Sequence, residues 1–401
     1  MVTPTGATAP LAGTTVVDFT RFVSGSYCTM LLAALGAEVV KIEMPPHGDS
    51  YRTQGVTKSD AGSTLFESLN RGKKSVLLDF RTDEGAATLE VVLAGADFFV
   101  HNSRPGSLDG RGLGYHDVHA RHPHLVYAAI SAFGDIGPDA ERGGFDLIVQ
   151  AESGIMSLTG APESGPVKVG APLLDVGAGL STTLAILAAH IDRMATGVGS
   201  QVSSSLLEFA LAGLTTVMAD VIATGEQPPL LGSHSPSFSP YGAFATSDGH
   251  IVLAGAGSDR LWPLMCELIG RVDLIDDPRF VDNAQRIKNR NELTDSIEAA
   301  LALQPSDQWL ATFDAAGLPA STVRSLGTVL ESEQLVALRQ VRPPVGAAQQ
   351  PAIDAPFRFD GVRPTLGAAP ELGADTADVL ARFGVGAAVI ERLIKAGRVA
   401  S

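Results

Sequence analysis

Cysteine, aromatic residues and positive charge are all scarce in this chain of 401 residues. Its two cysteines, Cys28 and Cys266, are too few for a disulfide framework or a cysteine-based zinc site. Both stand in apolar stretches, so we expect buried free thiols. The 44 acidic side chains outnumber the 29 basic ones and give a formal charge of −15, which argues against nonspecific nucleic-acid binding.

Long apolar runs are also missing. The nearest approach, residues 176–190, is interrupted by Gly, Ser and Thr, and the first residues show no basic segment followed by an apolar one. The sequence therefore predicts a soluble cytoplasmic protein that binds neither membranes nor nucleic acid.

Several familiar site motifs fail on inspection. Residues 71–75 superficially resemble a phosphate loop, but position 67 is Glu where the motif needs Gly, and the segment precedes a strand. The Gly pairs at 177/179 and 255/257 lack the third Gly of a dinucleotide fingerprint, and no G-x-S-x-G elbow occurs. The histidines within 116–124 lack a carboxylate at ligand spacing, so we expect a surface cluster and no metal.

What is present is a regular alternation of strands and helices. Strands are predicted at 14–20, 37–43, 74–80, 97–102 and 124–133, and helices at 26–35, 83–93 and 116–121. Apolar strands that alternate with helices predict an α/β fold with a doubly wound, Rossmann-like parallel sheet. Ligands of such sheets bind beyond the carboxyl ends of the strands.

The rest of the chain predicts a second, smaller domain. Helices are expected at 147–158 and 203–223, followed by a Pro/Ser/Gly-rich segment at 226–242. Residues 243–326 are typical of an α+β unit, with a hairpin around Asp248-Gly249 and helices near 259–269, 291–301 and 305–316. Two more helices are expected near 375–383 and 387–396. The predicted domains are therefore 1–224, 225–326 and a linker with a C-terminal segment, 327–401.

Asp175 is the only charged residue between Val169 and Ala189. A nearly all-apolar helix is predicted for 176–193, which places Asp175 at its N-cap, beside free N–H groups and the positive end of the helix dipole. That environment favours an ionised carboxylate, which is able to act as a nucleophile on an acyl group. From the spacing, a structural cap and a catalytic role are both open.

Basic residues gather near the predicted strand ends. They are Lys41, then Arg71, Lys73, Lys74 and Arg81, then Arg104 with Arg111. Each group by itself is typical of a solvated face. Together, in so acidic a chain, they favour a polyanionic ligand such as a nucleotide diphosphate.

At this point the sequence resembles a known family. The segments PLAGTTVVDFTRFVSGSYCTMLLAALGAEVVKIE, LNRGKKSVLLDFRTDEG, ADFFVHNSRPGSLDGRGLGY, GGFDLIVQAESGIMSLTG and VKVGAPLLDVGAG are similar in order and spacing to the class III CoA-transferases, the formyl-CoA and carnitine CoA-transferase type. The likeness continues to the C-terminal APFRFDG and PELGADT.

The resemblance implies a catalytic role for Asp175, with an acyl-CoA and a small carboxylic acid as substrates and no metal. In that family the aspartate attacks the thioester to form a mixed anhydride, and exchange passes through an aspartyl-CoA thioester. The oxyanions then need N–H donors, for which Gly177 and Gly179 or the Ser235–Tyr241 loop are candidates.

The resemblance also implies binding residues for CoA. They are Arg21, Phe22, Val23, Ser24, Leu78, Arg81, Asn102, Arg104 and Arg111. Phe145, Asp146, Gly177 and Tyr241 are implied on the substrate side or as supporting residues. Met44 and Gly110 stand where many relatives have Arg, so another arginine, among them Arg104, Arg111 or Arg142, is expected to compensate.

The family fold implies an interlocked homodimer of ring-shaped chains, in which the C-terminal segment returns to the large domain. The same fold includes the α-methylacyl-CoA racemases, which carry a His where this chain has Phe145. A racemase is therefore the alternative enzyme. A CoA-binding protein without catalytic activity is the alternative outside the enzymes. The SHSPSFSPYGAF segment lacks a long glycine-rich insertion, which favours the branch that uses succinyl-CoA with dicarboxylic acids.

Overall fold

The computed structural model describes residues 9–59, 61–342 and 352–395. The chain divides into two compact units. The first contains residues 1–153, 170–215 and 333–401, and the second contains residues 154–169 and 216–332. Residues 154–169, which the sequence analysis placed in the large domain, thus belong to the second unit.

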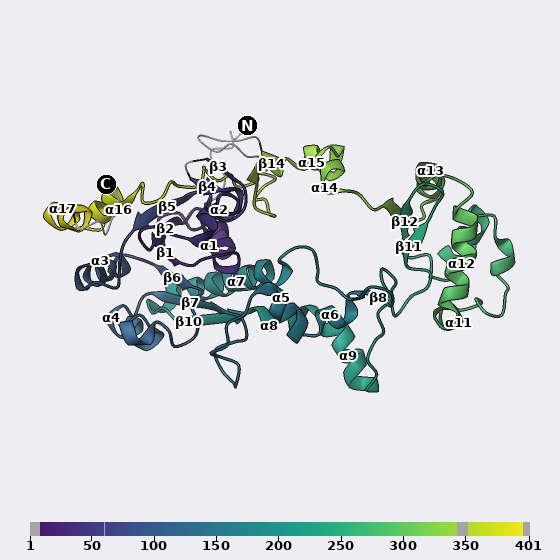
Figure 1. Cartoon of the computed structure of the whole chain (residues 1–401), viewed down its shortest axis with the longest axis horizontal. Coiled ribbons are helices and arrows are strands. Elements are labelled where there is room, and N and C mark those ends of the chain that lie inside the picture. Colours follow the sequence, from purple (N-terminus) through teal and green to yellow (C-terminus); the bar gives the residue numbers. More distant parts are fainter. Residues whose placement is uncertain (1–8, 60, 343–351, 396–401) are drawn as a thin grey trace. The chain divides into compact units, whose positions relative to one another are not determined.

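A six-stranded parallel sheet forms the centre of the first unit, in the order β10-β7-β6-β1-β2-β5 (Figure 1). The strands are β1 (Thr15–Phe19), β2 (Glu38–Glu43), β5 (Lys73–Leu77), β6 (Phe98–His101), β7 (Val126–Ser131) and β10 (Gln201–Ser205). The predicted parallel α/β sheet is confirmed. The sequence analysis had taken β10 for the start of a helix, because Gln-Val-Ser-Ser-Ser offers one apolar residue and a weak strand signal.

Helices cover both faces of this sheet. Phe98 contacts His190 of α7 (Leu173–Thr196), whereas the next residue, Phe99, packs in the core with α3 (Asp83–Ala94), because successive side chains of a strand point to opposite faces. The α7 side also carries α1 (Ser24–Ala34), α5 (Asp146–Glu152) and α8 (Leu206–Gly213). Further elements of the unit are the helices α2 (Thr64–Asn70), α4 (Tyr115–Arg121) and α15 (Glu333–Leu338), the 3-10 turns at Ser50–Arg52 and Asp109–Arg111, and the strand pairs β3 (Thr57–Ser59) with β4 (Gly62–Ser63) and β14 (Val341–Arg342) with β15 (Ala352–Ile353).

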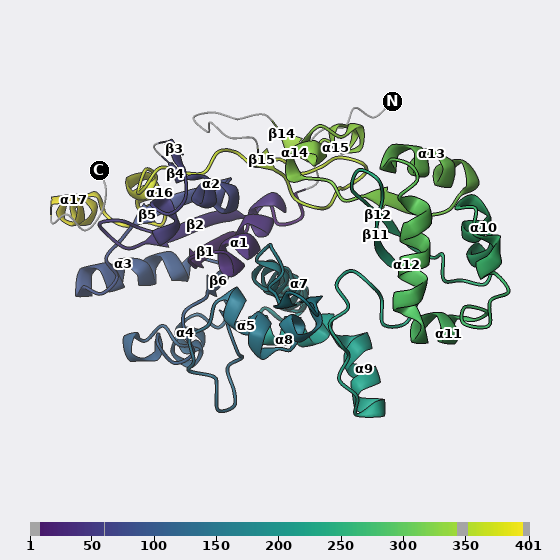
Figure 2. The ribbon, with the colours of Figure 1, turned by 45° about the vertical axis from the view of Figure 1, so that its right-hand side comes forward.

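The C-terminal segment packs against the β5 edge of the sheet (Figure 2). It contains α16 (Thr376–Arg382) and α17 (Ala387–Lys395), whose Leu380 and Leu393 are fully buried in the sheet core. The Thr376 hydroxyl accepts the Leu77 N–H at 3.0 Å, which fastens α16 to the end of β5.

The second unit has its own antiparallel sheet, β11-β12-β13, and its own core. Its elements are the strands β8 (Gly160–Ala161), β9 (Gly165–Pro166), β11 (Gly242–Ala245), β12 (His250–Leu253) and β13 (Ala320–Thr322), and the helices α6 (Ile155–Leu158), α9 (Thr215–Thr224), α10 (Leu261–Leu268), α11 (Asn283–Lys288), α12 (Arg290–Leu301), α13 (Ser306–Ala316) and α14 (Leu326–Leu330), with a 3-10 turn at Val272–Leu274. The predicted hairpin around Asp248-Gly249 is confirmed by the pairing of β11 with β12.

Two predicted helices are divided in the structure. The helix expected at 147–158 becomes α5 and α6, separated by Gly154, whose φ of 90° lies in the left-handed region. The helix expected at 203–223 becomes β10, α8 and α9. By length and composition α7 is apolar enough to cross a membrane, although half of its most apolar stretch is buried inside the protein. The helices α8 and α9, which follow each other with a bend of 70°, are together also long and apolar enough.

Candidate active site

Asp175 lies in the first turn of α7, at the third helical position, and not at its N-cap. The helix starts at Leu173, three residues earlier than predicted, with Pro172 as the N-cap. Pro172 has no side-chain oxygen to accept the free N–H groups of the first turn. The helix end therefore takes its cap from elsewhere in the chain.

Asp146, the first residue of α5, supplies that cap. Its Oδ2 accepts the Leu174 N–H at 2.8 Å and the Asp175 N–H at 3.2 Å, and its Oδ1 accepts a hydrogen bond from the Gln150 amide. The carboxylate thus occupies the positive end of the α7 dipole. The expected supporting residue Asp146 therefore holds the helix turn that carries Asp175, through a contact that spans 29 positions of sequence.

Burial and the neighbouring Asp146 carboxylate raise the pKa of Asp175 from 3.8 to about 6, although a hydrogen bond from the Ser24 side chain acts to lower this pKa. Desolvation and the like charge of Asp146 outweigh this hydrogen bond, so the carboxyl is harder to ionise than a surface aspartate. At neutral pH the group is ionised, poorly solvated and more basic than a surface aspartate. These properties suit a nucleophile.

An aromatic cluster lies next to the carboxylate. The Phe22 ring makes edge contacts with Tyr51 at 5.4 Å and with Phe145 at 5.7 Å between centroids. Phe22 has φ of 61°, a strained backbone for a residue with a Cβ, which persists where surrounding contacts fix it. Burial, with the charges of Asp175 and Asp49, raises the pKa of Tyr51, so its hydroxyl stays protonated. Phe145 itself is 65% exposed.

Glycines bring the helices around the site close together. A Cβ at Gly179 would lie 2.6 Å from the Ser24 carbonyl oxygen, so only Gly lets α1 lie directly on α7. A Cβ at Gly177 would lie 1.9 Å from the Phe209 ring of α8. Both glycines stand beyond the first turn of α7, where the helix itself accepts the N–H groups, and their role as oxyanion donors stays a prediction.

A cavity of about 210 Å³ opens at the carboxyl ends of β1 and β2. Its lining consists of Phe19, Thr20, Arg21, Lys41, Ile42, Glu43, Met44, Gly48, Asp49, Phe80, Ser103, Leu108 and Arg111. Two of its segments continue toward Asp175: Thr20–Arg21 leads to Ser24, and Asp49 leads to Tyr51. The cavity and Asp175 are thus connected by the same two loops.

The basic residues are distributed differently from the prediction. Lys41, Arg71 and Lys73 are buried in ion pairs with Asp49, Asp354 and Asp18, so the prediction that they meet a polyanion was wrong. Lys74 pairs with Glu38. No ion pair is found among the described residues for Arg21, Arg104 or Arg111, and Arg21 and Arg111 line the cavity.

Other expected binding residues have mainly structural contacts. Arg81 is exposed and pairs bidentately with Asp79, at 2.8 and 2.9 Å. Leu78 is fully buried in the sheet core. The Asn102 side chain accepts the Arg21 N–H at 2.9 Å and donates to the Arg21 carbonyl at 2.5 Å, which ties the β1 loop to the end of β6.

The remaining expectations concern the start of α1, the missing arginines and the second unit. Val23 is the buried N-cap of α1, and Met44 lines the cavity, as does Arg111 next to Gly110. Arg142 is engaged by Asp139 and Glu152. Tyr241 belongs to the second unit, so its role at the site stays a prediction.

Sequence reasoning missed the apolar walls of the cavity. Phe19 and Phe80 contact each other at 4.5 Å between ring centroids and line it together with Leu108. Phe19 is the second-to-last residue of the strand predicted at 14–20 and Phe80 is the last residue of the strand predicted at 74–80, and this position is the signal that would have identified them.

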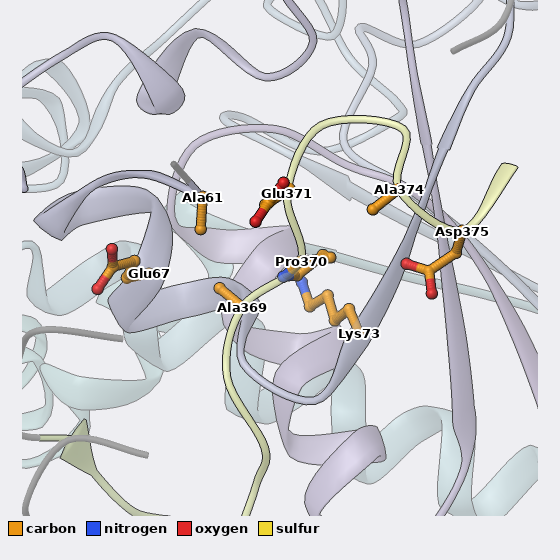
Figure 3. A pocket seen from close by; sticks show the side chains of 8 residues that line it. All are labelled: Ala61, Glu67, Lys73, Ala369, Pro370, Glu371, Ala374 and Asp375. Carbon is orange, nitrogen blue, oxygen red and sulfur yellow. The ribbon is translucent and has the colours of Figure 1, made fainter. Parts of the chain in front are cut away.

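A second cavity in this unit, of about 370 Å³, has the opposite character (Figure 3). Glu67, Glu371 and Asp375 contribute carboxylates to its lining, and the Asp375 Oδ2 accepts the Ser75 N–H at 2.9 Å. The first cavity also has acidic side chains in its lining, Glu43 and Asp49, but these are paired with Arg52 and Lys41. Because Arg21 and Arg111 have no acidic partner among the described residues, the cavity beside them is the better site for an anionic ligand. Across residues 9–59, 61–342 and 352–395, no group of three or more His, Cys, Asp or Glu is placed to hold a metal ion.

The raised pKa of Asp175 predicts that Asp175→Asn stabilises the protein at neutral and alkaline pH. A carboxyl whose pKa is higher in the folded than in the unfolded chain opposes folding above the folded pKa, and this effect fades as the pH falls from about 6 to 4. The gain is at most about 3 kcal/mol, or a few degrees in Tm. Thermal unfolding at pH 7.5 and pH 4 measures it; Asp192→Asn, at an exposed site on α7, is the control. An equal shift at both pH values would contradict the raised pKa.

Comparison with known proteins identifies the family of the chain. The sequence profile described as CoA-transferase family III matches residues 11–376. A succinyl-CoA:glutarate CoA-transferase from Mus musculus is 34% identical over 97% of this chain and 90% of that protein, and an acetyl-CoA:oxalate CoA-transferase from Acetobacter aceti is 35% identical over 84% and 86%.

Solved structures of similar proteins also match nearly the whole chain. A CAIB/BAIF family protein from Brucella suis has a TM-score of 0.84 at 33% identity, covering 94% of this chain and 100% of that one. A hypothetical protein from Mycobacterium tuberculosis has a TM-score of 0.83 at 32% identity, with coverage of 94% and 100%. The family profile and these likenesses together show that the chain is an enzyme of CoA-transferase family III.

Proposed function

We propose that this enzyme moves CoA from a dicarboxylic acyl-CoA, of which succinyl-CoA is the type, to a second small dicarboxylic acid, with Asp175 as the covalent nucleophile. The single observation that carries the proposal is the setting of Asp175. Its carboxyl is partly buried, has a raised pKa, meets the Ser24 side chain, and lies where two loops lead out to a cavity with free arginines.

The reaction balances with Asp175 as the only protein group that changes bonds. Its carboxylate attacks the thioester carbonyl, the C–S bond breaks, and CoA leaves as a thiolate from a mixed anhydride. The thiolate then attacks the aspartyl carbonyl and releases the donor acid, which leaves an aspartyl-CoA thioester. The acceptor carboxylate attacks the carbonyl of that thioester, the C–S bond breaks, and a second mixed anhydride forms as CoA thiolate leaves. The thiolate then attacks the acceptor carbonyl of this anhydride, which gives the acceptor acyl-CoA and releases the Asp175 carboxylate. Each acyl exchange is thus divided into easier steps.

The protein surroundings support this chemistry at two points. The Ser24 hydrogen bond is available to the carboxylate before attack, and the Phe22 ring packs against the Tyr51 and Phe145 rings beside the site. A bound ligand that covers the exposed Phe145 ring would help to keep water from the anhydride. The cavity suits the nucleotide end of CoA, because Arg21 and Arg111 are available to phosphate oxygens and Phe19 and Phe80 offer apolar faces.

The names of the relatives favour dicarboxylic substrates. They include succinyl-CoA:glutarate and succinyl-CoA:mesaconate CoA-transferases, the latter from Haloarcula hispanica. The test is a panel of succinyl-, acetyl- and formyl-CoA against glutarate, mesaconate, citramalate and oxalate, with the new thioester detected by mass spectrometry. We expect turnover with succinyl-CoA and at least one dicarboxylic acceptor. Production of free CoA alone, with every acceptor, would contradict the proposal.

The racemase alternative has a direct test in D₂O. Racemisation needs two bases, one on each face of the α-carbon, and the Phe145 ring cannot accept a proton. We expect no deuterium at the α-carbon of a 2-methylacyl-CoA, as followed by NMR. Deuterium uptake by the unmodified enzyme would favour the isomerase instead.

Arg111→Ala is expected to raise KM for the acyl-CoA about tenfold or more while changing KM for the acid little. The reason is the loss of one charge-assisted hydrogen bond to a phosphate, about 1.5–3 kcal/mol. Arg81→Ala is the matched comparison, because that guanidinium is held by Asp79 outside the cavity. Steady-state kinetics in low and high salt separate the two. A larger effect for Arg81 than for Arg111 would move the phosphate site away from the cavity.

We further propose that the enzyme is a homodimer, as the family resemblance implies. Support comes from α7, whose outer face exposes Leu180, Leu184, Ile191 and Met194 at 41%, 70%, 64% and 68%. Such a stripe is typical of a surface that another chain covers. Analytical ultracentrifugation is expected to give twice the chain mass of 41.6 kDa. A sedimenting monomer at micromolar concentration would contradict the dimer.

A further inference from the structure

Charged side chains from three adjacent strands meet on the sheet face that lies under α1. Asp18 of β1 and Lys41 of β2 are direct register partners, and Lys41 is opposite Ser75 of β5, two residues after Lys73. The exposures of Asp18, Lys41 and Lys73 are 0%, 0% and 5%. Charges are rarely buried so completely unless they are paired, and apolar residues of similar size would fill the same space.

One arm of this network reaches α1. Asp18 Oδ2 accepts from Lys73 Nζ at 2.9 Å and from the Thr29 hydroxyl at 2.8 Å. Lys73 Nζ also donates to the Ser26 carbonyl at 3.0 Å and to the Asn70 Oδ1 at 2.8 Å. The first turns of α1 are thereby fixed to the sheet below.

The other arm holds Thr20. Asp18 Oδ1 accepts the Thr20 N–H at 2.9 Å and its hydroxyl at 2.6 Å, while Lys41 Nζ donates to the Thr20 carbonyl at 2.8 Å. Lys41 also forms an ion pair with Asp49 at 3.0 Å. Every polar group of Thr20 is therefore engaged, and one ammonium joins the two loops that flank the reacting carboxylate.

The loop that Thr20 anchors is also tied at Arg21 by the two hydrogen bonds of Asn102. Its N-cap residue, Val23, provides no side-chain hydrogen bond to α1, and Phe22 is held at φ of 61°. Ser24 follows, with its side chain bonded to Asp175 and its carbonyl against Gly179. A strained loop of this kind persists where its ends are fixed.

We propose that Lys41 and Asp18 are positioning residues for catalysis: they fix Thr20, and through it the 20–24 loop, so that the Ser24 side chain meets the Asp175 carboxylate. Neither residue touches that carboxylate. The inference rests on the proposed function in that Asp175 is the reacting group. It explains why a buried ion pair is kept beneath a helix where apolar packing would serve stability equally well.

The test is the titration of Asp175 itself, followed by NMR of protein labelled at the aspartate γ-carboxyl carbon and assigned with Asp175→Asn. Ser24→Ala removes a hydrogen bond to the ionised form, so the midpoint rises. Lys41→Met is expected to raise the midpoint by at least half of the Ser24→Ala shift. It is also expected to lower kcat by a larger factor than it changes KM for the acyl-CoA. In the double variant Ser24→Ala/Lys41→Met the two pKa shifts are expected not to add, because both substitutions act through the same hydrogen bond. If Lys41→Met acted only by removing a positive charge at a distance from Asp175, the two shifts would add.

Two further variants guard against loss of folding and general effects. Thr20→Val removes one hydroxyl bond to Asp18 and is expected to give a smaller shift in the same direction. Arg71→Met breaks the buried pair with Asp354, which does not contact the loop, so it is expected to lower stability and leave the midpoint in place. The proposal is overturned if folded Lys41→Met and Thr20→Val both keep the native midpoint, or if the double variant is additive. An active Asp175→Asn enzyme would instead overturn the proposed function, whatever Lys41→Met does.

Discussion

Asp175→Asn and Asp175→Ala are both expected to lower CoA transfer by about 10³-fold or more, because no other group can form the covalent intermediate. The second carboxylate nearby, Asp146, accepts two N–H bonds at the start of α7 and is not free to replace it. The Asn variant keeps the size and polarity of the side chain, so its loss isolates the chemistry from packing. Initial rates of thioester formation from succinyl-CoA measure the effect.

The control is Asp192→Asn on the same helix, which is expected to keep full activity. Circular dichroism of all three variants should match the unmodified enzyme, because Asp146 and not Asp175 caps α7. Retention of more than about a tenth of the rate by Asp175→Asn would remove Asp175 from the covalent step.

Activity is expected to fall steeply below pH 6. Attack requires the ionised carboxylate, and its pKa in the free enzyme is about 6. The value of kcat/KM for the acyl-CoA reports the free enzyme, so it should be level above pH 7 and fall about tenfold per pH unit below the pKa. With a surface aspartate as the nucleophile, kcat/KM would not decline until about pH 4. At pH 4 the two cases therefore differ by about 100-fold in the fraction of kcat/KM that remains.

Two substitutions are expected to move this midpoint in opposite directions. Asp146→Asn removes a like charge and lowers the pKa of Asp175, whereas Ser24→Ala removes a hydrogen bond to the ionised form and raises it. Profiles for both variants, measured with the same donor, distinguish Asp175 from titration of the substrate. A midpoint that neither substitution moves would assign the pH dependence to another group.

The strand and helix pattern predicted the parallel sheet because its central strands are apolar and regularly spaced. It failed at β10, since an edge strand of Gln and Ser carries little hydrophobic signal. It also failed at the start of α7, because the cap comes from Asp146 and no local sequence rule predicts a partner 29 positions away.

For the site, the isolated position of Asp175 identified a carboxyl that the structure buries and whose pKa it raises, and its catalytic role stays a prediction; the pattern of basic residues was misleading. Lys41 and Lys73 were taken for ligand-binding residues, but their strands place them under α1, opposite Asp49 and Asp18. A lysine within an apolar strand or at its first residue has the same sequence signal whether it faces a ligand or a buried acid. Only the three-dimensional structure shows that these lysines have acidic partners, whereas Arg21 and Arg111 have none among the described residues.

The most direct test of the central claim is to trap the covalent intermediate. Enzyme is incubated with succinyl-CoA without acceptor and quenched with hydroxylamine, which converts an aspartyl anhydride or thioester into a hydroxamate, and the peptides are then analysed by mass spectrometry. We predict a hydroxamate at Asp175 that depends on acyl-CoA. A hydroxamate at a different residue, or active transfer with Asp175 unmodified throughout, would contradict the account.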